Sequence, residues 1–243
     1  MRALMFVALV LCALIQAPAA APKIVFLAGE FEYHSKETLP PFAKKLQDQF
    51  NVTTVVLARP DDEKDQTIPG LDQLKDADLL VVMVRRMTLP ENELNQIKAY
   101  VNSGKPIVGI RTASHAFENW KEWDHEVLGG NYQNHRGNQF KTTVTTVPEA
   151  KDHPILKGVT GFVSDGSLYR NTPLQKGSKP LLMGTIPDFP TEPIAWTHEY
   201  KGARVFYTSL GHPNDFKEAS FQNLLNNAIF WALNKPAEKR GSK

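Results

Sequence analysis

The sequence has 243 residues and a nearly balanced charge, with 28 Lys and Arg against 26 Asp and Glu and a formal net charge of +2. It contains no basic block and no aromatic–basic stripe, which argues against a nucleic-acid partner because phosphate binding needs clustered cations. The only cysteine, Cys12, lies in an N-terminal segment that we expect to be removed, which excludes thiol catalysis, disulfides and thiolate metal ligands in the mature chain.

The first 21 residues have the layout of a secretory signal peptide. Arg2 precedes an apolar run over 3–15, and small residues follow, including Ala19 to Ala21. The apolar run is too short for a membrane span, and no later segment predicts one. We therefore expect a secreted, periplasmic protein, cleaved near Ala19 to Ala21 and free of the membrane afterwards. Residues 22–243, about 220 in number, then form a single domain.

The first half of this domain alternates expected strands and helices. Short apolar runs rich in β-branched residues predict strands, and apolar residues at helical spacing predict helices. Pro90 near the start of the second helix and Gly104 just past its end are typical helix boundaries. The alternation predicts a parallel sheet with right-handed crossovers. The expected strands cover 23–29, 52–58, 76–84 and 106–110, and the expected helices cover 37–50 and 89–104.

The second half is less regular. The stretch over 139–147 alternates like a half-exposed strand, and three further apolar stretches predict strands. Two of these, 192–200 and 203–212, are joined by a turn at Lys201–Gly202. An amphipathic helix over 220–233 follows near the C-terminus. No linker divides the domain.

Polar residues follow the expected strands, where an open α/β sheet usually places its chemistry. Parallel strands gather their carboxyl ends along one edge, so these residues are candidates for a common site. Arg111 stands directly after the strand over 106–110, at the position where many enzymes carry a nucleophile. The candidates are His34, Arg111, His115, Asn134, His135, Asp165, Tyr169, His198 and His212.

Three chemistries compete for this edge. Serine hydrolysis has little support, because Ser114 lacks the flanking glycines of a nucleophile elbow. A zinc or manganese site would use histidines with a carboxylate, although no short histidine spacing marks one. Recognition of a carbohydrate would use Arg, Asn, Tyr and His together with aromatic faces. Trp120, Trp123 and Trp196 could supply those faces or simply pack in the core. The metal candidates are His34, His115, His135 and His212.

Two segments resemble the class I glutamine amidotransferase fold. The stretch "VGIRTAS" resembles its strand and nucleophile elbow, with Arg111 where the cysteine nucleophile would stand. The stretch "VFYTSLGHPND" retains His212 but has Asn214 at the acidic position. Two of the three triad members are therefore replaced, and we expect no glutaminase activity.

The similarity to the ThuA-like (trehalose-utilisation) family covers nearly the whole mature chain. It rests on "FEYHSKETLPPFAKKL", "GIRTASHAF", "LGGNYQNHRG", "DHPILKGVTGF", "SDGSLYRNTPL", "PIAWTHEYKGARVFYTSLGH" and "FQNLLNNAIFWAL". The resemblance implies a flavodoxin-like, class I glutamine amidotransferase-like α/β fold, with a mostly parallel sheet and helices on both faces. It also implies a link to disaccharides and their 3-keto derivatives. Family members commonly have histidine at the elbow, so Arg111 followed by His115 is a departure.

These observations lead to the hypothesis of an exported protein that binds and processes a sugar or keto-sugar. The alternatives are a non-catalytic carbohydrate-binding or scaffolding module and a metal-dependent hydrolase. In the first hypothesis His212 is a general base or acid, Arg111 holds an oxyanion and Tyr169 donates to a carbonyl oxygen. His115 completes the catalytic candidates. The expected substrate contacts are His34, Asn134, His135, Asp165 and His198.

Overall fold

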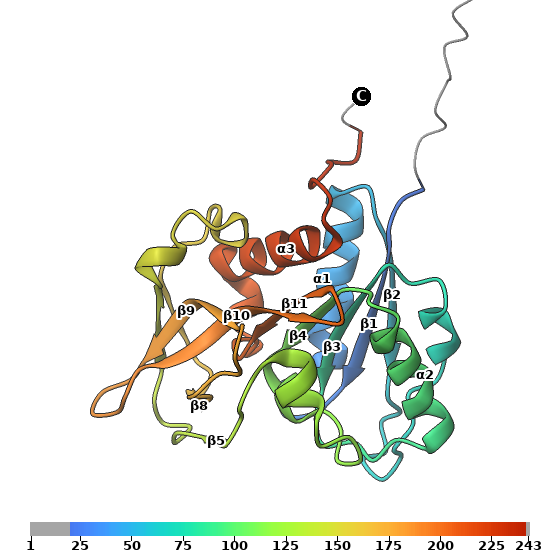
Figure 1. Cartoon of the computed structure of the whole chain (residues 1–243), viewed down its shortest axis with the longest axis horizontal. Coiled ribbons are helices and arrows are strands. Elements are labelled where there is room, and N and C mark those ends of the chain that lie inside the picture. The colour runs from blue at the N-terminus through green and yellow to red at the C-terminus, as the bar shows by residue number, and fades with distance from the viewer. Residues whose placement is uncertain (1–19, 242–243) are drawn as a thin grey trace, which may run out of the picture.

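A nine-stranded sheet forms the centre of the computed structural model, which describes residues 20–241 (Figure 1). The signal peptide expected over 1–21 lies outside the described residues except for its last two positions. One half of the sheet is parallel, as the alternation of strands and helices predicts. In order across the sheet this half consists of β2 (Thr53–Ala58), β1 (Lys23–Gly29), β3 (Leu79–Val84), β4 (Ile107–Ile110) and β11 (Ala203–Thr208).

The other half of the sheet is antiparallel. It continues from β11 through β10 (Glu192–Tyr200), β9 (Lys179–Thr185), β6 (Thr142–Thr146) and β7 (Phe162–Ser164). The turn between β10 and β11 is the predicted Lys201–Gly202, and both of its residues have positive φ. This hairpin reverses the chain, so β10 runs against the parallel strands.

A separate two-stranded ribbon joins β5 (Asn134–His135) to β8 (Tyr169–Arg170). Each strand of this ribbon is too short to show any apolar periodicity, so the ribbon is not among the elements that the sequence predicts. The pairing places His135 opposite Tyr169. Two candidate residues from separate loops therefore become neighbours.

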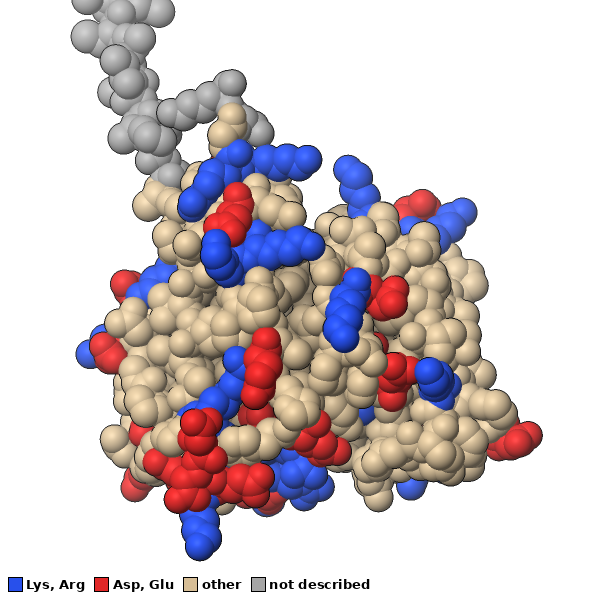
Figure 2. Space-filling view, turned by 180° about the vertical axis from the view of Figure 1, so that it is seen from behind, with Lys and Arg blue, Asp and Glu red and all other residues tan. Residues whose placement is uncertain are grey.

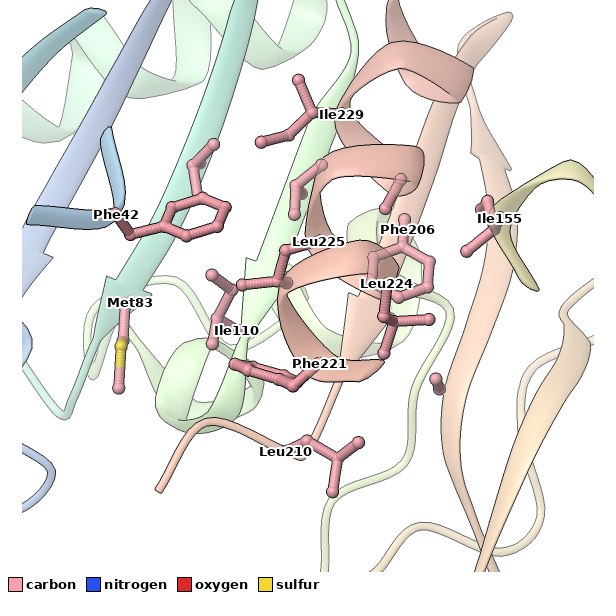
Figure 3. Close-up of a cluster of buried hydrophobic side chains, with 14 of the residues drawn as sticks. Phe42, Met83, Ile110, Ile155, Phe206, Leu210, Phe221, Leu224, Leu225 and Ile229 are labelled. Carbon is pink, nitrogen blue, oxygen red and sulfur yellow. The ribbon is translucent and has the colours of Figure 1, made fainter. Parts of the chain in front are cut away.

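Helices cover both faces of the sheet. α1 (Ser35–Gln49) and α3 (Ala219–Leu233) pack on one face, where Leu224 of α3 belongs to the same buried cluster as Ile110 of β4 (Figure 3). α2 (Glu91–Asn102) covers the opposite face together with short helical turns. Since successive strand residues point to opposite faces, every central strand contributes to both clusters. The predicted fold class is confirmed.

Helix α1 begins at Ser35, two residues before the predicted start at residue 37. The side chain of Glu30, five residues before Ser35, accounts for this earlier start. The buried Glu30 carboxylate accepts the backbone N–H groups of Tyr33 at 2.7 Å and Ser35 at 2.8 Å. This carboxylate satisfies N–H groups at the start of the helix and stabilises its first turn. It also fixes the segment between β1 and α1, where candidate residues lie.

The surface carries charge of both signs. Figure 2 shows Lys and Arg side chains interspersed with Asp and Glu over the face that it displays. Among the helices of residues 20–241, none has the length and apolar character needed to cross a bilayer.

Candidate functional site

Three residues at one edge of the sheet have a left-handed backbone. His34 after β1 has a φ of 54°, Arg86 after β3 has a φ of 48° and Arg111 after β4 has a φ of 49°. Residues other than glycine adopt this conformation rarely, and such residues cluster at functional sites. Strands β1, β3 and β4 are neighbours, so all three residues lie along the carboxyl edge. This edge is the candidate site.

Arg111 is buried beneath this edge, with 1% of its surface exposed. Its Nη1 donates to the carbonyl oxygens of Ser167 at 3.0 Å and Ser209 at 2.5 Å. Its Nη2 donates to the hydroxyls of Tyr33 and Ser167, both at 3.0 Å. The sequence predicts that Arg111 contacts an oxyanion directly, and this geometry does not offer that contact. The guanidinium reaches a ligand only through the groups that it holds.

Two tyrosines stack on the Arg111 guanidinium. Its Cζ lies 4.5 Å from the ring centre of Tyr33 and 4.2 Å from that of Tyr169, which are cation–π distances. The Tyr33 oxygen accepts a hydrogen bond from Arg111, so its own O–H is left to donate elsewhere. Burial raises the pKa of Tyr169, and its phenol therefore stays protonated at neutral pH. The stack presents hydroxyl donors backed by a fixed positive charge.

His115 continues the stack on its other side. Its ring lies 4.3 Å from that of Tyr132 with an interplanar angle of 19°, and 5.9 Å from that of Tyr169. Burial and the neighbouring cations Arg86, Arg85 and Arg111 lower the pKa of His115 to about 3. The imidazole is therefore neutral at physiological pH, and with Tyr132 it forms a flat, uncharged surface.

The two other imidazoles of this cluster have opposite tautomers. His135 Nδ1 lies 2.7 Å from the carbonyl oxygen of Arg136, which can only accept, so Nδ1 carries the proton and Nε2 has a free lone pair. His212 Nδ1 accepts the backbone N–H of Asn214 at 3.3 Å, so the proton is on Nε2. Burial lowers the pKa of His212, against the opposing charges of nearby acids. These assignments make His135 a base and neutral His212 a donor.

Buried hydrogen bonds hold the loop that carries His212. The Asp215 carboxylate is 1% exposed and accepts the backbone N–H groups of Gly211 at 2.9 Å and His212 at 3.0 Å. Asp165 accepts from the Asn214 amide at 2.8 Å and pairs with Lys141. Of these two acids, Asp215 holds the backbone of the loop, and Asp165 holds the side chain of Asn214.

The structure does not bring every predicted residue to this cluster. His198 lies on antiparallel β10, so its end of the strand is at the opposite edge, where Nδ1 is 3.0 Å from Ser178 Oγ. His198 therefore lies apart from the other candidates, and its role as a substrate contact stays a prediction. His34 and Asn134 lie outside the stack with exposed side chains, and His34 Nδ1 is 3.9 Å from Glu37.

The predicted metal ligands, His34, His115, His135 and His212, do not form a metal-binding cluster either. Within the described range 20–241, no three His, Cys, Asp or Glu side chains lie close enough together to hold an ion. The tryptophans Trp120, Trp123 and Trp196 belong to the buried cluster beneath α2, so they pack in the core. Trp120 and Trp123 nevertheless line a cleft at the candidate site, where the other aromatic faces include those of His115 and Tyr132.

A cleft of about 340 Å³ opens at this edge. Arg86, Ser114, His115, Tyr132 and Gln133 are among its lining residues, and its volume falls within the range of small-molecule sites. The cleft lies beside the stack: its lining does not include Tyr33, Arg111, Tyr169, His135 or His212. Tyr33, Tyr132 and Arg86 were not among the predicted site residues. The only sequence signal for them was their position in polar segments that follow strands.

Comparisons with known proteins agree on the fold. A family model, ThuA, described as trehalose utilisation, matches residues 23–232. No curated protein matches the chain. A protein of Bacteroides uniformis described as ThuA-like has 21% identity and a TM-score of 0.67, over 90% of this chain and 95% of its own. One of Parabacteroides merdae, also described as ThuA-like, has 17% identity and a TM-score of 0.68, over 91% and 94%.

A larger enzyme contains the same fold. A cold-adapted β-galactosidase from Rahnella sp. R3 has 15% identity and a TM-score of 0.57. The match covers 89% of this chain but 32% of that enzyme. At such identities these structures establish the flavodoxin-like, glutamine amidotransferase-like fold alone.

Proposed function

The chain belongs to the ThuA (trehalose utilisation) family, and on that premise we propose that the carboxyl edge of its sheet binds and processes a sugar or keto-sugar. One observation carries the proposal: Tyr33, Arg111 and Tyr169 form a stack flanked by two imidazoles of opposite tautomer. Hydroxyl donors, one free lone pair and planar rings suit a polyhydroxylated ligand that carries a carbonyl group.

The carbonyl oxygen of a keto-sugar is the group that this site would activate. The Tyr33 O–H and the His212 Nε2–H donate to it, with Tyr169 as a further hydroxyl donor. The charge of Arg111, held behind Tyr33, stabilises the enolate oxygen as it forms. Arg111 is therefore a positioning residue, and its role differs from the direct oxyanion contact expected from the sequence.

Proton abstraction falls to His135, whose Nε2 lone pair is free. It takes a proton from the carbon beside the carbonyl, which leaves an enolate. Isomerisation follows when the hydroxyl proton of that carbon moves to the enolate oxygen and the abstracted proton returns from His135 to the former carbonyl carbon. Alternatively, the glycosidic C–O bond breaks, the enolate collapses to an unsaturated ketone and the leaving oxygen takes the proton from His135. Both routes balance without a thiol.

The test uses trehalose and its 3-keto derivative as probes, with binding measured by calorimetry and turnover by NMR. We expect His135→Gln and Tyr33→Phe to lower kcat by about 100-fold or more while the Kd changes little. His153→Gln is the matched control, since this imidazole accepts the Ile155 N–H, caps a helical turn and packs against Trp231, away from the site. A chelator should leave turnover unchanged.

A non-catalytic carbohydrate-binding module is the second candidate. It is favoured by the elbow, where the nucleophile position holds an arginine engaged in internal hydrogen bonds. Binding of the keto-sugar without turnover would select this candidate. Absence of both binding and turnover would overturn the proposal, and turnover that survives His135→Gln would overturn the assigned base.

We also propose that this function is carried out after export to the periplasm. In support, the Pro22 carbonyl accepts the Thr53 N–H at 2.9 Å, and β1 begins at Lys23. Cleavage near Ala19 to Ala21 would therefore keep every strand of the sheet.

A further inference from the structure

A second cleft, of about 380 Å³, opens at the ends of β1, β2 and β3. The proposed sugar chemistry does not use it. Three arginines line it, Arg59 after β2 and Arg85 and Arg86 after β3. The rest of the lining is Phe31, Gln66 and three glutamates, Glu30, Glu32 and Glu63. Arg86 also lines the 340 Å³ cleft beside His115, so this one side chain borders both.

Arg59 is the most deeply buried cation of this second cleft, at 6% exposed. Its Nη2 donates to the backbone carbonyls of Glu63 at 2.9 Å and Asp65 at 2.8 Å. Its Cζ lies 4.7 Å from the ring centre of Phe31. Within residues 20–241 its buried Nε has no hydrogen-bond partner, and no carboxylate lies within ion-pair distance. The side chain is fixed in place with its charge unpaired.

A buried guanidinium without a counter-ion is unusual, because removal of a charge from water is costly unless an opposite charge compensates it. The acids whose charges act on Arg59 are Glu63, Asp65 and Asp62 of the loop after β2, and none of them forms an ion pair with it within residues 20–241. The other acids of the cleft are engaged elsewhere. Glu32 pairs with Arg85 at 2.8 Å, and the Glu30 carboxylate accepts backbone N–H groups. Glu63 lines the cleft with an exposed side chain. Burial lowers the pKa of Arg59 despite the nearby acidic loop, which agrees with incomplete compensation.

We infer that this cleft is an anion-binding subsite, in which Arg59 holds a carboxylate or phosphate group. Arg85 and Arg86, which pair with Glu32 and Glu118, add positive charge at its border. The planar fork of a guanidinium matches both groups, and charge-assisted hydrogen bonds to it are the strong ones. Because Arg86 borders both clefts, the anion would belong to the ligand of the neighbouring site. The sugar would then be an acidic or phosphorylated one, and this last step alone rests on the proposed function.

The test titrates the mature protein with inorganic phosphate and, separately, with acetate, using calorimetry and no sugar. We expect binding of at least one anion and a loss of about tenfold or more in affinity for Arg59→Gln. Arg204→Gln is the matched control, because Arg204 also donates to a backbone carbonyl and stacks on an aromatic ring, that of Trp231. The affinity of Arg204→Gln for phosphate or acetate should equal that of the wild type.

A second variant covers the case in which Arg59→Gln fails to fold. Glu63→Gln changes an exposed side chain and removes a competing negative charge, so it should raise anion affinity about twofold or more. Binding of phosphate alone indicates a phosphorylated ligand, and equal binding of acetate indicates a carboxylate. No anion binding to the wild type, or unchanged affinity in Glu63→Gln, overturns the inference. The anion titration and keto-sugar turnover can each fail without the other.

Discussion

Single side chains in this molecule are held in protonation states that suit their surroundings. His115 shows this most clearly, since burial and three cations keep its imidazole neutral. A neutral imidazole can stack closely on Tyr132 without a desolvated charge. The protonation state of His115 is therefore a property of its position and contributes to stability.

The lowered pKa of His115 makes the stability of the protein depend on pH. The unfolded chain takes up a proton on this imidazole near pH 6.5, and the folded chain takes it up only near pH 3. The contribution of His115 is therefore complete above pH 6.5 and is lost as the pH falls, by up to about 1.4 kcal/mol per pH unit.

Urea unfolding of the wild type and His115→Gln between pH 7 and pH 4 checks this prediction. The difference in unfolding free energy should shift steadily in favour of the variant as the pH falls. Other histidines and acids titrate in both proteins, so the difference isolates His115. A difference that stays constant over this range would contradict the prediction.

Among the secondary-structure elements, β4 shows how a strand positions the site. Gly109 in β4 leaves room for Tyr207 of β11, because a Cβ at position 109 would lie 2.9 Å from Tyr207 Cδ2 and 3.2 Å from Leu128 Cδ2. Tyr207 in turn donates its O–H to the Arg111 carbonyl at 2.6 Å. The left-handed elbow is thus fixed by a tyrosine from the neighbouring strand.

A double-mutant cycle should reveal this coupling. We expect Gly109→Ala to lower the unfolding free energy by about 1–3 kcal/mol, because the added methyl displaces Tyr207. Tyr207→Phe should cost about 1 kcal/mol through loss of its hydrogen bond. The double variant should lose less than the sum, since both changes disrupt the same contact. Strictly additive losses, measured by urea unfolding, would contradict the arrangement.

The sequence predicts the positions of the strands and helices better than it predicts the direction in which each strand runs. Apolar periodicity identified the central strands and the three long helices, because burial dictates that pattern directly. Periodicity does not give the direction of a strand, but the predicted turn at Lys201–Gly202 implies that β10 runs antiparallel to β11. That implication places His198 at the edge opposite to the other candidates. Apolar periodicity also could not connect Tyr33 to Arg111, which are 78 residues apart in the chain. Contacts of that range depend on how the loops pack.

On the scale of the whole molecule, the described fold accommodates removal of the N-terminal segment. The Lys23 N–H donates to Asp78 at 2.8 Å, and its Nζ pairs with Asp76 at 2.7 Å. These contacts join the start of β1 to the turn before β3. A chain that begins at Pro22 retains all of them.

Expression of the full chain in a bacterium, followed by fractionation and N-terminal sequencing, tests the export proposal. We expect a periplasmic product that begins between Ala20 and Pro22 and unfolds with the same free energy as a chain made directly from Pro22. A chain that begins at Ile24 serves as the control and should lose about 1–2 kcal/mol with the Lys23 contacts. An uncleaved cytoplasmic product would contradict the proposal.

The buried guanidinium at the elbow also constrains how this sequence can evolve. Replacement of Arg111 by a small residue such as cysteine would leave a cavity and deprive two backbone carbonyls of their donors. The stacked tyrosines would lose their cation at the same time. A tolerated replacement of Arg111 would therefore require coordinated changes in the loops that carry Tyr33, Ser167 and Ser209.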